Sequence, residues 1–155
     1  MKTVAIIQAR MQSTRLPGKV IRPICGEPMI NLILERLSEA KRIDQIVLAT
    51  SEDSANDQLV KTVSELGYTV YRGSENDVLD RYYQVAKEVG ADIIVRITGD
   101  CPLIDPTLVD EIIERFLETG VEYACNISPP TYPDGLDLEV FTFSALEKAW
   151  KHAKK

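Results

Sequence analysis

The chain has one histidine among its 155 residues, and this residue, His152, lies in a lysine-rich C-terminal segment. A catalytic triad with a histidine base, or a histidine metal cluster, is therefore not expected. The sequence also lacks an apolar run of the roughly 20 residues that a membrane-spanning helix needs, and its N-terminus lacks the pattern of a signal peptide. We therefore predict a cytoplasmic protein that has no membrane partner.

Cysteine is scarce as well. Cys25, Cys101 and Cys125 are odd in number, widely spaced and without the paired spacing of a zinc site, so we expect reduced thiols. Cys101 follows a candidate metal ligand, which leaves a functional role open, but a small buried side chain is the favoured interpretation.

Positive charge is also in deficit, because the formal net charge is −6 at pH 7 and no basic stripe with interleaved aromatic residues offsets it. The backbone of a nucleic acid would be repelled, so we expect no nucleic-acid partner. The remaining composition, with 45% hydrophobic and 27% charged residues, is that of a globular protein, and the length fits one domain.

Apolar strand-like runs alternate with helical patterns along most of the chain, which predicts a mostly parallel α/β sheet with covering helices. We expect strands over residues 3–7, 46–49, 68–71, 92–98, 121–126 and 138–143, with residues 92–98 in a central position. Pro28, the region of Asp77 and Asp105-Pro106 are expected to begin helices, and Leu59, Val63 and Leu66 to share one apolar helix face. Ser144 and Glu147 have the spacing of a capping box for a last helix through Trp150.

The segment from Gln8 to Lys19 follows the first predicted strand and is locally basic in an acidic protein. A nucleoside triphosphate needs guanidinium forks, an ammonium charge and short donors around its oxygens. This segment supplies them from Arg10, Ser13, Thr14, Arg15 and Lys19, with Gly18 for a close approach or a turn. The alternative is a solvated basic loop, because the spacing matches neither the P-loop nor the dinucleotide-binding turn.

Asp100 follows the predicted central strand, and ligands of open α/β sheets lie beyond the carboxyl ends of the strands. The basic loop and Asp100 are thus expected at the same edge. Asp100 could hold Mg²⁺, which takes one or two carboxylates together with phosphate oxygens and water. A turn aspartate is the alternative, because Gly-Asp is a common turn dipeptide.

Two other polar segments remain open in their interpretation. Residues 74–81 could contact a base or ribose, although capping by Ser74 or Asn76 and an exposed Asp77–Arg81 pair would explain them almost as well. Residues 134–139 carry three carboxylates, of which Asp137 and Glu139 project to one side of a strand. These could face a sugar or a metal, or simply line a solvated strand face.

Residues 8–19, together with residues 26–29, resemble the N-terminal signature of cytidylyltransferases that activate acidic sugars. Residues 74–83, 96–105 and 133–141 resemble the spore-coat polysaccharide (SpsF-type) branch, which is related to the 3-deoxy-manno-octulosonate and acylneuraminate cytidylyltransferases. The resemblance covers essentially the whole chain. It implies a Rossmann-like nucleotidyltransferase fold over residues 1–155, with helices on both faces of the sheet.

The resemblance further implies that CTP and an acidic sugar react to a CMP-sugar and pyrophosphate for polysaccharide biosynthesis. The expected nucleotide-binding residues are Gln8, Ala9, Arg10, Ser13, Thr14, Arg15, Gly18, Lys19, Ser74, Asp77, Arg81 and Thr98. Arg15, Lys19 and Asp100 are the expected catalytic residues, with Asp100 as the Mg²⁺ ligand. Asp134, Asp137 and Glu139 are expected toward the sugar.

Members of this family usually continue beyond this length, and their C-terminal part carries another metal-binding aspartate and contributes to a homodimer. We find no counterpart of that aspartate and expect the chain to be C-terminally truncated relative to the family, with Asp137 or Glu139 as a substitute second ligand. Two alternatives stay open: a nucleotide-sugar-dependent glycosyltransferase, although Asp100-Cys101-Pro102 is not its Asp-x-Asp motif, and a non-catalytic nucleotide-binding module.

Overall fold

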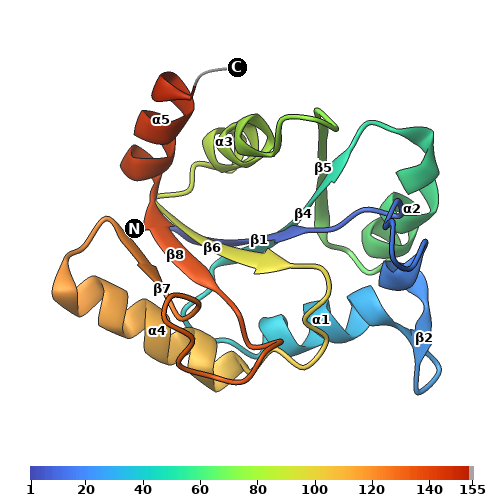
Figure 1. Cartoon of the computed structure of the whole chain (residues 1–155), viewed down its shortest axis with the longest axis horizontal. Coiled ribbons are helices and arrows are strands. Elements are labelled where there is room, and N and C mark those ends of the chain that lie inside the picture. Colours follow the sequence, from blue (N-terminus) through green and yellow to red (C-terminus); the bar gives the residue numbers. More distant parts are fainter. Residues whose placement is uncertain (154–155) are drawn as a thin grey trace.

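Four parallel strands run through the middle of the protein, which a computed structural model describes over residues 1–153 (Figure 1). They are β1 (Thr3–Gln8), β4 (Gln45–Ser51), β5 (Thr69–Gly73) and β6 (Ile93–Thr98). The antiparallel strands β7 (Tyr123–Cys125) and β8 (Glu139–Thr142) complete the sheet in the order β5-β4-β1-β6-β8-β7. The predicted mostly parallel α/β sheet is confirmed, and β6 is an interior strand.

Helices cover both faces of this sheet, which is why its inner strands are apolar in nearly every position. The helices α1 (Met29–Ser38), α2 (Asp57–Glu65) and α4 (Pro106–Thr119) pack on the face that includes Ala5 and Ile7. The helices α3 (Val78–Val89) and α5 (Phe143–His152) pack on the face that includes Val4 and Ile6 (Figure 1). No helix within the described part of the chain is long and apolar enough to cross a membrane. The end of the lysine-rich segment, residues 154–155, lies outside the described residues.

Two helices begin directly after an aspartate whose side chain caps them. Asp77 caps α3 by accepting a hydrogen bond from Asp80 N at 2.9 Å, and Asp105 caps α4 by accepting from Thr107 N at 2.8 Å. Helix α5 lies against α3 because the Trp150 ring stacks on Tyr83 with centroids 4.1 Å apart. The helices near Asp77 and at Asp105-Pro106 are therefore confirmed.

The predicted capping box of the last helix is wrong. Strand β8 ends at Thr142 and α5 begins at the next residue, so Thr142 Oγ1 accepts the hydrogen bond from Ala145 N at 3.1 Å and Ser144 lies inside the first turn. Leu66 also does not share the apolar face of α2. It lies after the end of the helix and is 47% exposed, because Gly67 reverses the chain with a φ of 84°.

A short hairpin follows the basic loop and was not predicted. The 3-10 helix η1 (Lys19–Ile21) leads into β2 (Pro23–Ile24), which pairs with β3 (Glu27–Pro28). Cys25 and Gly26 form the turn with φ of 52° and 92°, which is the conformation that a tight two-residue hairpin turn requires. The turn directs the chain back to the start of α1.

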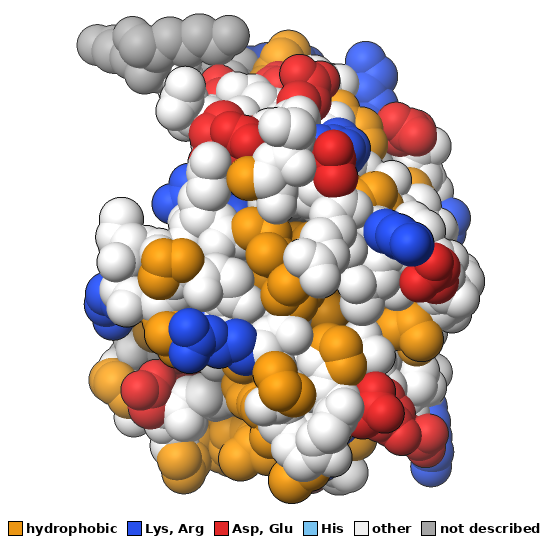
Figure 2. All heavy atoms as spheres, turned by 90° about the vertical axis from the view of Figure 1, so that its right-hand side faces the viewer, with side chains coloured by type: hydrophobic (Ala, Val, Ile, Leu, Met, Phe, Trp, Pro, Cys, Tyr) orange, Lys and Arg blue, Asp and Glu red, His pale blue; other side chains and the backbone are white. Residues whose placement is uncertain are grey.

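The strand register decides which loops meet. Gln8 at the end of β1 pairs with Ala49 of β4 on one side and with Thr98 of β6 on the other. The loops after β1 and β6 therefore leave the sheet side by side, at its carboxyl edge. Figure 2 views the molecule from this edge, where Lys and Arg side chains lie beside exposed apolar ones.

Candidate functional site

A pocket of about 320 Å³ opens at the carboxyl edge between the ends of β1 and β6. Most of the residues expected to bind a nucleotide line it together with the expected metal ligand Asp100: Gln8, Ala9, Arg10, Ser13, Thr14, Arg15, Lys19 and Thr98. It is also lined by residues for which the sequence predicted no role in the site: Gln12, Val20, Arg96 and Gly99. Residues 8–20 and 96–100, two segments that are far apart in the sequence, thus form one polar pocket.

An ion pair joins these two segments. Lys19 Nζ lies 2.9 Å from Asp100 Oδ2, with the side chains 26% and 45% exposed. The hydrogen bond from Lys19 lowers the pKa of Asp100 below its ordinary value of 3.8, and the Thr98 hydroxyl contributes to the same effect. Asp100 is therefore a carboxylate at neutral pH and already attracts a cation into the pocket.

Gly99 makes this meeting of segments sterically feasible. Its backbone N donates to Gln8 O at 2.8 Å, which extends the β1–β6 pairing by one residue. A Cβ atom at Gly99 would lie 2.5 Å from Ala9 Cβ, which is closer than real Cβ contacts come. The Gly-Asp dipeptide is therefore more than a turn signal, because the glycine lets the basic loop approach the end of β6.

Two backbone hydrogen bonds to one residue, Met11, close the basic loop. The Met11 carbonyl oxygen accepts from Ser13 N at 3.0 Å and from Gly18 N at 2.8 Å. Gly18 has a φ of 69°, in the left-handed region, and it does not line the pocket. Its observed contribution is to return the chain toward Met11, while its expected nucleotide contact stays a prediction.

The segment 74–81 reaches the pocket through Glu75. Arg10 Nη1 donates to Glu75 Oε1 at 2.7 Å, so a residue of the segment holds a cation of the pocket. The prediction of an exposed Asp77–Arg81 pair is wrong, because Arg81 is only 3% exposed and its guanidinium donates to Ser74 O at 2.7 Å. Contacts of Ser74, Asp77 and Arg81 thus stabilise the start of α3, and none of the three residues lines the pocket. Their expected contacts with the nucleotide stay predictions.

The acidic segment 134–139 lies on the other side of β6. Glu139 forms an ion pair with Arg96, its neighbour in the β6–β8 register, while Asp134 is exposed on the preceding loop. Asp137 lies beside the thiol of Cys101, which is buried as predicted and has a pKa that burial raises. None of the three carboxylates lines the polar pocket, and residues 1–153 contain no group of three or more potential metal-binding side chains.

Arg96 connects the polar pocket with a second cavity. This cavity has a volume of about 390 Å³ and lies between α3, α5 and the strands β6 to β8. Apart from the Arg96–Glu139 pair and two tyrosines, its lining is apolar: Val78, Leu79, Phe141, Ala145, Leu146 and Ala149. Any ligand that extended past Arg96 would pass from a polar to an apolar environment.

Residues 4–155 match a protein family described as cytidylyltransferase. The chain is 44% identical over its full length to an uncharacterized protein of Methanocaldococcus jannaschii, of which it covers 63%. It is 40% identical, over 81% of its length, to the spore coat polysaccharide biosynthesis protein SpsF of Bacillus subtilis, of which the match covers 54%. The chain thus spans about half to two thirds of the length of the curated relatives that it matches.

Solved structures share the architecture. A cytidylyltransferase from Leptospira borgpetersenii aligns with a TM-score of 0.95 and 40% identity, over 100% of this chain and 66% of that one. CMP:2-keto-3-deoxy-manno-octonic acid synthetase in complex with CTP aligns with a TM-score of 0.81 over 100% of this chain and 80% of that one. At 20% identity, this second likeness concerns the fold alone.

Proposed function

The chain belongs to the cytidylyltransferase family, and we propose on this basis that it transfers CMP from CTP to an acidic sugar and releases pyrophosphate. The observation that carries the proposal is the ion pair between Lys19 and Asp100, which brings the proposed phosphate-binding cation and the proposed metal ligand into one pocket. Relatives that are named for CTP-dependent sugar activation, such as 3-deoxy-manno-octulosonate cytidylyltransferase, support the choice of nucleotide and of acceptor class.

In this proposal the basic loop binds the triphosphate. Arg15 and Lys19 neutralise the phosphate charges, and the Ser13 and Thr14 hydroxyls donate to phosphate oxygens. Arg10, which Glu75 holds at the pocket wall, contributes a third cation. Gln8, Ala9 and Thr98 line the pocket at the carboxyl ends of β1 and β6, and they are the proposed contacts of the nucleoside.

Asp100 is the proposed Mg²⁺ ligand, and the donor set of the pocket fits that ion. The pocket offers Asp100 as its acidic side chain, and Mg²⁺ commonly uses one or two carboxylates with phosphate oxygens and water for the rest. Lys19 already lies against the same carboxylate, so the position attracts cations. When bound, Mg²⁺ would supply stabilisation of the charge that develops on the phosphates.

The chemistry requires no protein nucleophile. The anomeric hydroxyl of the sugar attacks the α-phosphorus and gives up its proton to solvent, while the bond between the α-phosphorus and the oxygen that bridges to the β-phosphate breaks and pyrophosphate leaves with that oxygen. Lys19 and Arg15 neutralise the departing pyrophosphate, so their contribution is electrostatic and greatest where negative charge accumulates. The residues of the basic loop therefore act mainly by positioning and by charge.

The acceptor is proposed to lie on the side of β6 that faces the second cavity. Glu139 and Arg96 would contact it there, with Asp134 and Asp137 on the adjoining loop, and Asp137 or Glu139 could serve as a second metal ligand. A single nucleotidyltransferase domain and a homodimer, which the family resemblance implies, complete the proposal together with the predicted cytoplasmic location.

Pyrophosphate release from CTP, Mg²⁺ and a panel of acidic sugars tests the proposal. We expect release with at least one sugar, and its loss in the Arg15→Ala and Asp100→Ala variants. Arg115→Ala, on the exposed side of α4, is the matched control and should release pyrophosphate as the parent does. If both site variants released pyrophosphate as fast as the parent, the assignment of the site would be refuted. If the parent bound CTP but released no pyrophosphate, the chain would be a non-catalytic nucleotide-binding module.

A further inference from the structure

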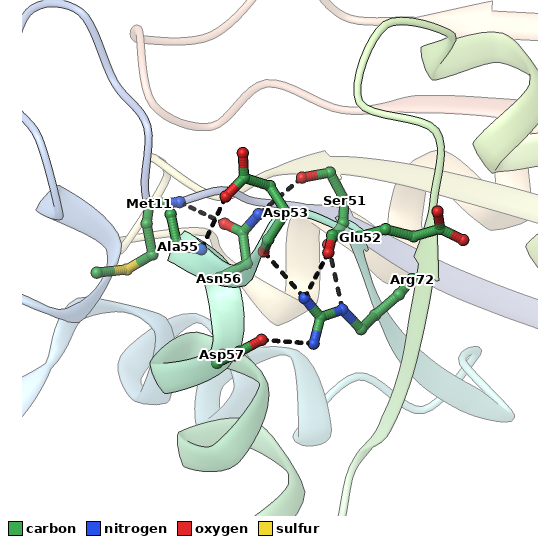
Figure 3. Close-up of polar contacts among 8 residues, drawn as sticks. All are labelled: Met11, Ser51, Glu52, Asp53, Ala55, Asn56, Asp57 and Arg72. Carbon is green, nitrogen blue, oxygen red and sulfur yellow. Dashed lines mark hydrogen bonds and ion pairs between the residues drawn. The ribbon is translucent and has the colours of Figure 1, made fainter.

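Asn56 is a fully buried polar side chain next to the proposed nucleotide site. It ends the short 3-10 helix η2 (Ser54–Asn56) and has 0% exposure. Its Oδ1 accepts from Met11 N at 2.8 Å, and its Nδ2 donates to Ser51 Oγ at 2.7 Å (Figure 3). Both ends of the amide are thus paired, which is the arrangement that fixes a buried asparagine in one orientation.

The residue that Asn56 holds is the one on which the basic loop closes. The Met11 carbonyl accepts from Ser13 N and Gly18 N, while the Met11 amide donates to Asn56. The proposed triphosphate-binding side chains of Ser13, Thr14 and Arg15 belong to the segment closed in this way, and Lys19 follows it directly. A second contact, from Gln12 Nε2 to Asp53 Oδ2 at 3.1 Å, connects the loop to the same turn of the chain.

Arg72 of β5 keeps this turn in place. Its guanidinium donates to the carbonyl oxygens of Ser51, Glu52 and Asp53 at 2.9 to 3.3 Å and to Asp57 Oδ1 at 2.7 Å (Figure 3). A guanidinium that reaches several acceptors of one turn restricts the turn more than a single bond would. The support for Met11 therefore extends from β5 through the turn to Asn56.

We propose that Asn56 is a positioning residue of the triphosphate site, which fixes the backbone of Met11 and through it the basic loop. The inference rests on the proposed function, because the loop that Asn56 supports is the proposed triphosphate site. A general stabilising role for a buried asparagine is the competing explanation, and Asn126 provides the comparison. Asn126 is 5% exposed and also pairs both amide ends, with Leu136 O at 2.8 Å and Leu138 N at 3.0 Å, but on the opposite side of β6.

Two measurements on the full chain test the proposal: hydrogen exchange at the Met11 amide, and calorimetric affinity for Mg·CTP. In Asn56→Ala we expect the Met11 amide to lose its protection and the affinity to fall about tenfold or more, as loss of a buried hydrogen-bonding partner implies. Asn56→Asp keeps an acceptor for Met11 and should restore the protection. Asn126→Ala should lower the melting temperature to a similar extent and leave both readouts close to those of the parent.

The outcomes separate this inference from the proposed function. If the parent bound Mg·CTP and Asn56→Ala bound it equally well, the positioning role would be refuted and the proposed function would stand. If Asn126→Ala weakened binding as much as Asn56→Ala, a general loss of stability would explain both and the inference would fail. If the parent bound no nucleoside triphosphate, the proposed function itself would fail, and the positioning role with it.

Discussion

The two sides of β6 differ in how their polar groups are held. On the β1 side, the basic loop presents Arg10, Arg15 and Lys19 around a polar pocket, and buried groups such as Asn56 support the loop from behind. On the β8 side, the second cavity is mostly apolar, and the Arg96–Glu139 pair is its main charged feature.

This difference matches two different binding problems. A triphosphate has the same charge and geometry whatever its acceptor, so fixed cations on a supported loop suit it. An acceptor sugar offers fewer charges, and a cavity with one ion pair at its polar end distinguishes ligands by shape and by a few contacts. Arg96 lines both spaces and marks the boundary between the two sides.

The largest effect is expected on the β1 side, from Lys19→Met. The variant removes the ammonium group that lies 2.9 Å from Asp100, and Mg·CTP affinity should fall about 10- to 100-fold, the range for hydrogen bonds to charged groups. Calorimetric titration measures it, with Lys61→Met on the exposed surface of α2 as the matched control. An unchanged Mg·CTP affinity in Lys19→Met would contradict the assignment of the triphosphate site to the β1 side.

Gly99→Ala should act on both stability and binding. The new methyl group would collide with Ala9 Cβ, and overpacking of this kind costs about 1–3 kcal/mol of unfolding free energy. Because the collision separates the basic loop from Asp100, Mg·CTP affinity should fall as well. Gly67→Ala is the control, since its φ of 84° is strained but its surroundings are open, so it should lose stability alone. Denaturant unfolding with calorimetry distinguishes the two, and wild-type affinity in Gly99→Ala would contradict the steric argument.

Glu139→Gln tests whether the two sides are independent. It keeps an acceptor for Arg96 but removes the charge, so CTP affinity should stay within about twofold while pyrophosphate release with an acidic sugar declines. Calorimetry and the pyrophosphate assay together measure it. A loss of CTP affinity comparable to that of Lys19→Met would show that the two sides act as one site.

The smallest expected effect concerns pH. Lys19 and Thr98 keep the folded-state pKa of Asp100 below 3.8, so the stability from its ionised form is fully present above that value and is lost as pH falls through the lower folded pKa. Because Asp100 is nearly half exposed, solvent screening reduces the effect. Unfolding curves of the parent and Asp100→Asn between pH 3 and 6 should converge toward the acidic end. A difference that widened at low pH would contradict the assigned ion pair.

The sequence predicted the β1 side better than the β8 side, for a physical reason. Strand order in a parallel sheet brings the carboxyl ends of neighbouring strands together, so a basic loop after β1 and Asp100 after β6 could be placed in one pocket from the pattern alone. The support of the loop by Asn56 could not be predicted from the sequence. Asn56 lies among polar residues that are typical of an ordinary helix start, and its hydrogen bond with Met11 joins positions 45 residues apart.

The glycine before Asp100 and the start of the last helix show the same limit. Gly-Asp is a common turn dipeptide, and only the approach of Ala9 reveals why that position excludes a side chain. Ser144 and Glu147 fit a capping box in sequence, yet the pairing of β8 with β6 extends to Thr142, and the cap moves with the end of the strand. Contacts between distant segments decide such details, and local pattern does not contain them.

The most direct test of the central claim is calorimetric titration of the chain with CTP, UTP, GTP and ATP, each with and without Mg²⁺. The proposal predicts selective binding of CTP that depends on Mg²⁺ and is lost in Asp100→Ala. Binding of no triphosphate, or equal binding of all four without dependence on Mg²⁺ or Asp100, would contradict it.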